Sequence, residues 1–462
     1  MLNKIVLQQH KDVEQLQNHL PLQRFASSLT QSTREFYGNL VKSGISYIFE
    51  CKHRSPATGA LREDYPISTL AKSYAGFATA ISVLTNKRFF GGSFDHLKMV
   101  SEAITLPILC KDIIIHPYQI ALARLHQADA ILLMLSVLDD KTYQACKSLA
   151  LSYKMAVITE VYSEEEMMRA NQLKANIILV NQRCLHSMAI DKQRVHKLAP
   201  YFPKDAIIIG ASGIETHNEI NALRPFVNGY LIGSALSKSN NISQTMKNLI
   251  FGPIKVCGLT RLEDAQVAHQ LGATYGGLIF APNSLRKVTL SQAIPIARSG
   301  LSMVGVFANQ PVEEVISIAR KLKLTAVQLH GQEPPDTIFF LRQHLPRNCQ
   351  IWLAVDGNLP LPELLPQNVD KLIVDNKTDC FGGTGRSFDW RVLKASPQLE
   401  KIMLSGGISI NNAIEAKQTN VWGIDINSSV EHSPGLKDKC KLESFFNLLK
   451  THGGRHANCL FR

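Results

Sequence analysis

The sequence lacks any uninterrupted apolar run approaching the roughly 20 residues that a membrane-spanning helix needs. Its first segment, MLNKIVLQQHKDVEQLQNHL, mixes charged side chains into the apolar positions and has no apolar core of a signal peptide. This spacing predicts an amphipathic helix instead. We therefore expect no membrane insertion and a cytoplasmic location.

Paired cysteines are absent as well. The nine cysteines are odd in number, scattered, and form no CxxC pair, which argues against a disulfide framework and a structural zinc site. Such usage is typical of a reducing cytoplasm. The fifteen histidines include no HExxH motif, so we expect no zinc-protease site and predict no metal.

Long basic runs are also missing, although the formal net charge is +12. The lysines and arginines are spread along the chain, and no aromatic RNA-binding signature accompanies them. We therefore expect no nucleic-acid partner. Small anionic substrates would account for part of the positive charge.

What the chain does contain is a regular alternation of short apolar runs and amphipathic segments. With 462 residues it is too long for one hydrophobic core, so we expect two domains. Each half carries eight apolar, β-branched runs, which indicates buried parallel strands joined by helices. The runs lie at 46–52, 78–85, 107–112, 129–135, 155–161, 176–181, 206–211 and 228–233, and at 254–258, 275–281, 302–307, 325–330, 350–355, 371–375, 401–405 and 422–427. Eight strands close a (β/α)8 barrel, so the sequence predicts an α/β fold of two tandem TIM barrels.

The predicted boundary between the barrels falls near residues 248–254. We expect a first domain over 1–250, in which residues 1–45 form a helical extension that serves as a lid. The second domain is expected over 254–450. Residues 451–462 have no periodicity and are predicted to form a flexible tail.

Small residues follow the seventh and eighth runs of both halves. The segments are ASGI (211–214) and GSAL (233–236), then SGGI (405–408) and INSS (426–429). Such residues let backbone N–H groups approach an anion closely. A single Ser-Gly turn can be merely a turn, but the repeated pair predicts one phosphate site in each barrel.

Charged and amide side chains end several strands of the first half. In a barrel of this kind they would all reach the C-terminal face, where active sites lie. A lysine and a glutamate that face one substrate can donate and accept protons. An ion-pair network that closes the barrel top is the alternative. The residues are Glu50, Lys52, Lys111, Glu160, Asn181 and Arg183.

The second half ends its first strand with Cys257 and its sixth with Asp375. A buried cysteine is commonly core filler. A thiol opposed to a carboxyl group across a barrel mouth is also a usable base and acid pair. Gln328 and His330 end the fourth strand, and Arg286 follows the second.

Several of these motifs, taken together and in order, are specific. They are ECKHRSP (50–56), PILCKDIIIHPYQI (107–120), LLMLSVLDD (132–140), ITEV (158–161), NGYLIGSAL (228–236), KVCGLTRLEDA (255–265), AVQLHG (326–331), FGGTGRSFDW (381–390) and INSSVEHSPGLKD (426–438). The chain resembles the bifunctional tryptophan-biosynthesis enzymes in which indole-3-glycerol-phosphate synthase is fused to phosphoribosylanthranilate isomerase. The match runs from about residue 20 to residue 440.

The resemblance implies that the second barrel converts N-(5-phosphoribosyl)anthranilate to 1-(2-carboxyphenylamino)-1-deoxyribulose 5-phosphate by an Amadori rearrangement. Asp375 matches the general acid, and Cys257 matches the base. Arg286 would hold the anthranilate carboxylate. The remaining predicted ligands in this barrel are Gln328 and His330, and for phosphate Gly406, Gly407, Ser428 and Ser429.

For the first barrel the resemblance implies ring closure, decarboxylation and dehydration of that product to indole-3-glycerol phosphate. Lys111 matches the acid that protonates the carbonyl, and Glu160 the acid/base group of the dehydration. Lys52 would face the substrate carboxylate, while Glu50 and Asn181 orient the reacting region. The predicted phosphate ligands are Arg183, Ser212, Gly213, Gly233 and Ser234.

The chain departs from the family pattern at several positions. Ala211 stands where the synthases usually have glutamate, so a supporting carboxylate is missing. The other changes are Asn86-Lys87-Arg88 for an acidic-Glu-Lys run, Ala57 for serine, Leu179 for glycine, Cys184 for aspartate, and Leu353 where lysine is common. We expect both activities; an isomerase fused to a weakened synthase, and a non-catalytic phosphate-binding scaffold, are the alternatives. No cofactor is implied, and we expect a monomer.

Overall fold

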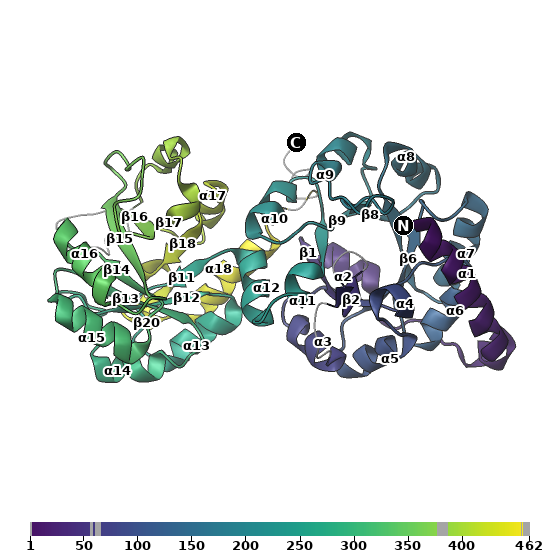
Figure 1. Cartoon of the computed structure of the whole chain (residues 1–462), viewed down its shortest axis with the longest axis horizontal. Helices are drawn as coiled ribbons and strands as arrows, with labels where there is room; N and C mark the ends of the chain where they lie inside the picture. Colours follow the sequence, from purple (N-terminus) through teal and green to yellow (C-terminus); the bar gives the residue numbers. More distant parts are fainter. Residues whose placement is uncertain (1, 56–58, 61–65, 377–386, 454, 456–462) are drawn as a thin grey trace. The chain divides into compact units, whose positions relative to one another are not determined.

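The computed structural model describes residues 2–55, 59–60, 66–376, 387–453 and 455. The chain forms two compact units, one reaching to Leu249 together with residues from Thr451 on, the other running from Ile250 to Lys450. Each unit contains a closed barrel of eight strands (Figure 1). The predicted fold of two tandem TIM barrels is thereby confirmed.

In the first barrel every strand pairs in parallel with its neighbours along the chain. The strands are β1 (Ser46–Cys51), β4 (Ala80–Leu84), β5 (Ile108–Lys111), β6 (Ala130–Met134), β7 (Ala156–Val161), β8 (Ile177–Asn181), β9 (Ile207–Ala211) and β10 (Gly229–Ile232). Almost every strand residue is buried, because helices cover the outside and side chains fill the inside. This two-sided burial explains why the strands read as continuous apolar runs.

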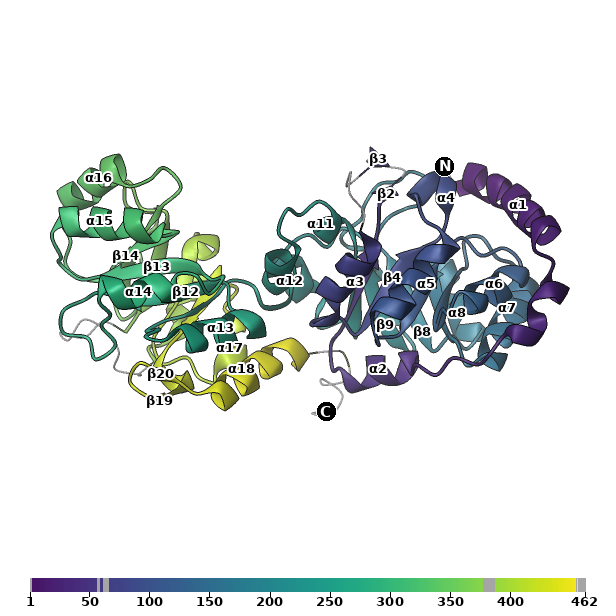
Figure 2. The ribbon, with the colours of Figure 1, turned by 90° about the horizontal axis from the view of Figure 1, so that it is seen from below.

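Helices surround these strands, as Figure 2 shows for α3, α5, α6, α7 and α8. They are α3 (Ile67–Ala75), α4 (Lys87–Phe90), α5 (Phe94–Ala103), α6 (Tyr118–Leu125), α7 (Asp140–Ser152), α8 (Glu164–Gln172), α9 (Arg194–Leu198), α10 (His217–Leu223), α11 (Ser234–Ser237) and α12 (Ile242–Phe251), with a 3-10 turn at Ala199–Tyr201. A short hairpin, β2 (Arg54–Ser55) and β3 (Gly59–Ala60), follows β1.

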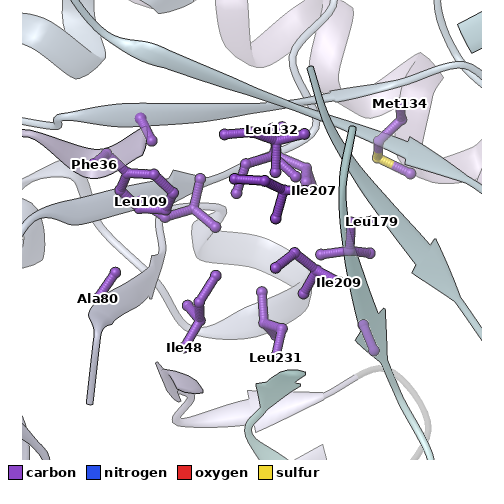
Figure 3. Packing of buried hydrophobic residues seen from close by; sticks show 14 of the residues in the cluster. Phe36, Ile48, Ala80, Leu109, Leu132, Met134, Leu179, Ile207, Ile209 and Leu231 are labelled. Atoms are coloured by element: carbon purple, nitrogen blue, oxygen red, sulfur yellow. The ribbon is translucent and has the colours of Figure 1, made fainter. Parts of the chain in front are cut away.

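Two helices precede the first barrel, α1 (Leu2–His19) and α2 (Phe36–Lys42), separated by 3-10 turns at Leu22–Arg24 and Ala26–Ser28. Both contribute to the core of the barrel. Figure 3 shows this core, in which Phe36 of α2 packs with strand residues such as Leu109 and Ile209. Leu2 and Ile5 of α1 belong to the same cluster. The N-terminal extension is therefore part of the barrel's packing.

The second barrel repeats the pattern with parallel strands in chain order. Its strands are β11 (Ile254–Val256), β12 (Tyr275–Ile279), β13 (Ser302–Phe307), β14 (Ala326–Leu329), β15 (Gln350–Asp356), β16 (Lys371–Asp375), β17 (Ile402–Leu404) and β18 (Gly423–Ile426). Its helices are α13 (Leu262–Leu271), α14 (Leu290–Ile296), α15 (Val312–Leu322), α16 (Pro335–His344), α17 (Ala413–Gln418) and α18 (Lys439–Thr451), with 3-10 turns at Trp390–Ala395, Leu399–Lys401 and Ser428–Val430. A small hairpin, β19 (Glu431–Ser433) and β20 (Leu436–Lys437), precedes α18.

Within the predicted tail the structure describes Thr451, His452, Gly453 and Arg455. The guanidinium of Arg455 donates to the carbonyl oxygens of Ala206 at 2.9 Å and Pro203 at 2.6 Å, both in the first unit. The rest of the tail lies outside the described residues. Across the described parts of the chain, no helix combines the length and the apolar character that crossing a bilayer requires.

Candidate active sites

The carboxyl ends of the first barrel's strands surround one cavity. All ten residues that the sequence predicts for this barrel line it: Glu50, Lys52, Lys111, Glu160, Asn181, Arg183, Ser212, Gly213, Gly233 and Ser234. They come from β1, β5, β7, β8, β9 and β10 and from the turns that follow. Barrel closure thus gathers side chains that are up to 184 positions apart in the sequence.

Glu50 occupies the centre of the ion pairs in this cavity. Its side chain is 3% exposed, and its two carboxylate oxygens lie 3.0 Å from Lys52 Nζ and 3.2 Å from Lys111 Nζ. Burial alone would raise the pKa of Glu50, but the two ammonium groups outweigh it and lower the pKa to about 2. Gly233 provides the space that the Glu50 carboxylate occupies, since a Cβ at position 233 would collide with this carboxylate.

Glu160 has the opposite environment. Burial raises the pKa of its carboxyl group, although Lys111 and the Asn181 amide oppose the rise. Asn181 Nδ2 donates to Glu160 Oε1 at 3.0 Å. Burial would lower the pKa of Lys111, yet Glu50 and Glu160 outweigh it and raise that pKa. The cavity therefore holds a charged lysine between one ionised carboxylate and one carboxyl group that favours its neutral form.

The turn after β9 has an unusual backbone. Ser212 has φ +67° and Gly213 has φ +69°, and a left-handed non-glycine residue of this kind points to a functional constraint. The buried Gln182 holds the turn, because its Nε2 donates to the Ser212 carbonyl at 2.7 Å. Sequence reasoning missed Gln182, whose neighbours Asn181 and Arg183 carried the more obvious signal.

The other predicted phosphate ligands lie beside this turn. Lys52 Nζ donates to Ser234 Oγ at 3.0 Å, and Gly233 precedes the first turn of α11. Arg183 is fixed at both ends, since its backbone N–H donates to Asn181 Oδ1 at 3.0 Å and its Nη1 to the Met188 carbonyl at 2.9 Å. These residues line the same cavity as the Ser212–Gly213 turn.

Of the residues that depart from the family pattern in the first barrel, some line the cavity and others have structural partners of their own. Ala211 and Leu179 line the cavity and are buried, so the missing carboxylate leaves an apolar wall. Asn86 caps α4, because its Oδ1 accepts from the Phe89 N–H at 3.0 Å. Cys184 is half-buried, and hydrogen bonds with Ser187 are the main cause that lowers the pKa of its thiol. Ala57 lies outside the described residues.

The second barrel has its own cavity at the same end of the strands. It is lined by most of the predicted residues: Cys257, Arg286, Gln328, His330, Asp375, Gly406, Gly407 and Ser428. Ser429 is not on its wall, and the hydroxyl of this residue donates to the Ile408 carbonyl at 2.6 Å. The glycine-rich segment FGGTGRSFDW lies mostly outside the described residues. Cys257 and Asp375, the predicted base and acid, share one cavity.

Two charged residues that sequence reasoning missed lie behind Cys257. Lys255 is fully buried on β11, and its Nζ lies 2.6 Å from Asp425 Oδ2 on β18. The sequence signal that could have found them is the charge of Lys255 in the middle of an apolar strand, because burying a charge is costly unless the charge is paired or used. Asp375 accepts a hydrogen bond from Ser405 Oγ at 3.1 Å.

Arg286 is held by the β19–β20 hairpin. Its Nε and Nη2 donate to the Glu431 carboxylate at 2.8–3.1 Å, and Lys437 Nζ donates to the same carboxylate at 2.8 Å. Leu353, the departure on β15, does not line the cavity. Its neighbours Trp352 and Ala354 point into the barrel core, so alternation along the strand places Leu353 on the outer face.

Comparison with known proteins covers both units. Residues 2–249 match the family described as Indole-3-glycerol phosphate synthase, and residues 254–448 match N-(5'phosphoribosyl)anthranilate (PRA) isomerase. Tryptophan biosynthesis protein TrpCF of Vibrio cholerae is 43% identical over 454 residues, which cover 98% of this chain and 96% of the relative. Its counterpart in Salmonella typhi is 44% identical over 453 residues, with 98% and 99% covered. A solved phosphoribosyl anthranilate isomerase from Thermus thermophilus is 31% identical, with a TM-score of 0.38, over 45% of this chain and 99% of that one.

Proposed function

The chain belongs to the family of bifunctional tryptophan-biosynthesis proteins, with the synthase first and the isomerase second, and on that premise we propose how each barrel mouth performs its reaction. The N-terminal barrel is the indole-3-glycerol-phosphate synthase and the C-terminal barrel is the phosphoribosylanthranilate isomerase. Their substrates are phosphorylated small molecules. The roles of individual residues are our assignment.

In the isomerase barrel Asp375 donates a proton to the furanose ring oxygen of N-(5-phosphoribosyl)anthranilate, and the C1′–O bond breaks to give an open-chain imine. Cys257, as the thiolate, removes the proton from C2′. The resulting enolamine tautomerises to the 2-keto product, so the reaction consumes no external oxidant or reductant. Support comes from the cavity that Cys257 and Asp375 share.

Substrate binding in this barrel is assigned to the residues around that pair. Arg286, oriented by Glu431, holds the anthranilate carboxylate through its guanidinium. Gly406, Gly407 and Ser428 bind the phosphate through backbone N–H groups; Ser429, which does not line the cavity, is left out of this assignment. Gln328 and His330 contact the sugar from the end of β14. Their side chains are hydrogen-bonded to each other, with Gln328 Nε2 lying 3.2 Å from His330 Nδ1.

In the synthase barrel Lys111 protonates the substrate carbonyl while the anthranilate ring carbon attacks it. Carbon dioxide leaves, and Glu160 serves as the acid/base group that releases water to complete the indole. The low pKa of Glu50 keeps this carboxylate ionised, so that it orients both lysines, and the raised pKa of Glu160 suits proton donation. Lys52 faces the substrate carboxylate, and Asn181 fixes Glu160.

Phosphate binding in the synthase barrel is assigned to Arg183, Ser212, Gly213, Gly233 and Ser234. Small residues and exposed backbone donors at the ends of β9 and β10 fit an anion. The left-handed Ser212–Gly213 turn supports this, because strain of that kind is retained where it serves a site. No cofactor is needed, since protonated lysine, carboxyl and thiol groups move all the protons.

The single observation that carries the synthase assignments is the grouping of all ten predicted first-barrel residues on one cavity. The test is a steady-state assay of each half-reaction on the purified chain. Turnover in both assays is expected. Because Ala211 and Leu179 line the synthase cavity, an isomerase fused to a weakened synthase is the second candidate. Absence of indole-3-glycerol phosphate at high enzyme concentration would favour that candidate.

We further propose that the chain acts as a monomer in the cytoplasm. The described cysteines are all free, which suits a reducing compartment. Sedimentation equilibrium is expected to give a mass near the 51.3 kDa of one chain. A mass of twice that value would contradict the monomer.

A further inference from the structure

The first strand of the isomerase barrel carries two chemical groups on one face. Lys255 and Cys257 are two residues apart, so both side chains point into the barrel. Asp425 lies opposite Lys255 in the register between β11 and β18. The strand pairing therefore places an ammonium, a carboxylate and a thiol side by side.

Packing confirms how close the ammonium and the thiol are. Lys255 Nζ donates to Asp425 Oδ2 at 2.6 Å, and the lysine charge lies near enough to the Cys257 thiol to favour the thiolate. A Cβ placed on Gly277 would lie 2.6 Å from Cys257 Sγ and 3.1 Å from Lys255 Cε, so both atoms adjoin the same small space on β12. A side chain larger than that of glycine at this position would collide with the Cys257 sulfur.

A buried Lys–Asp pair of this kind is expensive to keep. Removing two charges from water carries a large desolvation cost. A protein with well-packed apolar residues of similar volume in their place is often as stable, or more stable. Lys255 is fully buried and Asp425 lines the cavity, where its Oδ1 has no hydrogen-bond partner among the described residues. A charge pair retained beside a reactive thiol points to a task at that thiol.

We propose that Lys255 is a positioning residue that stabilises the Cys257 thiolate, while Asp425 holds the Lys255 ammonium in place. The inference rests on the proposed role of Cys257 as base. The thiol proton leaves to water through the open mouth before the chemical step. The thiolate then takes the C2′ proton and becomes a thiol again, and the electron pair of the C2′–H bond moves into the C1′–C2′ bond. Lys255 keeps its proton throughout.

Other charged groups also face this thiol, and they set its titration together. Burial raises the pKa of the Cys257 thiol above its ordinary value. Among the charged groups, Lys255 opposes this rise most strongly, Lys437 of β20 opposes it weakly, and Asp425 adds to it. Arg286, His330 and Asp375 complete the titratable groups of the cavity wall. Replacing Lys255 alone should therefore raise the pKa of the thiol.

The test is the pH dependence of Cys257 alkylation by iodoacetamide, followed by mass spectrometry of the peptide that contains Cys257. We expect Lys255→Met to shift the midpoint upward by about one pH unit or more, which leaves about tenfold less thiolate at neutral pH. The isomerase kcat at pH 7 should fall by about tenfold or more, with KM changed less than about threefold. Synthase turnover should stay the same.

Two further variants serve as controls, one for the charge at position 255 and one for folding. Lys255→Arg retains the charge and should keep the alkylation midpoint near that of the wild type. The double variant Lys255→Met/Asp425→Asn removes both buried charges, so it should fold even where the single variant does not, and its midpoint should also rise. An unchanged midpoint in the folded double variant would overturn the proposal. Full isomerase activity in Cys257→Ala would instead refute the assignment of Cys257 as the base. The alkylation midpoints of the Lys255 variants would still report whether Lys255 stabilises the thiolate.

Discussion

Two glutamates in the synthase mouth show how neighbours decide the role of one chemical group. Glu50 lies between two ammonium groups, which hold its pKa at about 2 despite burial. Glu160 is equally buried, but Lys111 and an amide do not offset its desolvation, so the pKa is raised. One carboxylate therefore stays ionised near neutral pH, and the other is suited to hold and release a proton.

Glu160→Gln is expected to abolish the synthase reaction and to stabilise the first barrel at pH 7. The raised pKa of Glu160 means that its ionised form destabilises the folded state above the unfolded pKa near 4.5. The stabilising effect of the substitution should therefore be largest near neutral pH and vanish below about pH 4. Urea unfolding at pH 7 and pH 4 measures it. A variant that is less stable than wild type at pH 7 would contradict the assigned environment.

Ala211→Glu is expected to raise the synthase rate, because it restores a carboxylate to the cavity wall. By analogy with one preorganised group, the expected gain is on the order of 10- to 1000-fold in kcat. Leu179 lines the same cavity, so Ala211→Glu/Leu179→Gly provides the space that the carboxylate needs. The steady-state rate of indole-3-glycerol phosphate formation is the measurement, and Ala211→Gln is the matched control. An unchanged rate in both glutamate variants would show that the site has compensated.

Much of the site was predictable from the sequence because a TIM barrel brings all strand ends to one face. Polar residues at those ends, such as Lys111, Glu160 and Asp375, therefore stood out. Their orienting partners did not. Lys255 pairs with Asp425, 170 residues away, and Arg286 with Glu431, 145 residues away. Only closure of the barrel reveals such pairs.

At the scale of elements, helix α1 connects the outside of the first barrel to its mouth. Leu2 and Ile5, at its start, line the synthase cavity. Gln9, one turn further, is buried, accepts from Asn86 Nδ2 at 2.7 Å, and lies 3.5 Å from Asp112 Oδ1. The end of α1 packs on α6, where Val13 joins Tyr118. Gln9 thus forms a polar latch at the mouth, and Val13 anchors the helix on the barrel wall. The role of α1 as a lid stays a prediction.

Gln9→Leu is expected to lower the synthase kcat/KM by about 10-fold, because it leaves the Asn86 amide and Asp112 without this partner and frees the start of α1. The isomerase should be unaffected. Kinetics of both half-reactions measure the effect. Leu7→Gln, on the exposed side of the same helix, is the control and should leave the synthase rate unchanged. Equal losses in the two variants would argue against a latch.

The elements themselves were predictable to different degrees. Every barrel strand was expected, since strands buried on both faces read as apolar runs. The hairpins β2–β3 and β19–β20 were not, because strands of two or three residues, several of them polar, leave no periodic signal. Yet β19 supplies Glu431, which orients Arg286.

At the scale of the molecule, each cavity is built from one unit alone. The residues around the synthase cavity all lie between positions 2 and 238, and those around the isomerase cavity between 257 and 428. Each cavity therefore holds the residues that we assign to the reaction of its own barrel. The two activities should be separable by single substitutions.

Asp375→Asn and Lys111→Ala, assayed side by side in both half-reactions, test this separation most directly. Asp375→Asn should reduce isomerisation by about 100- to 10,000-fold, the usual range for a lost general acid, and leave indole-3-glycerol phosphate synthesis unchanged. Lys111→Ala should show the reverse pattern. Circular dichroism of both variants confirms folding. Loss of both activities in either folded variant, or full isomerase turnover in Asp375→Asn, would contradict the assignment of one reaction to each barrel.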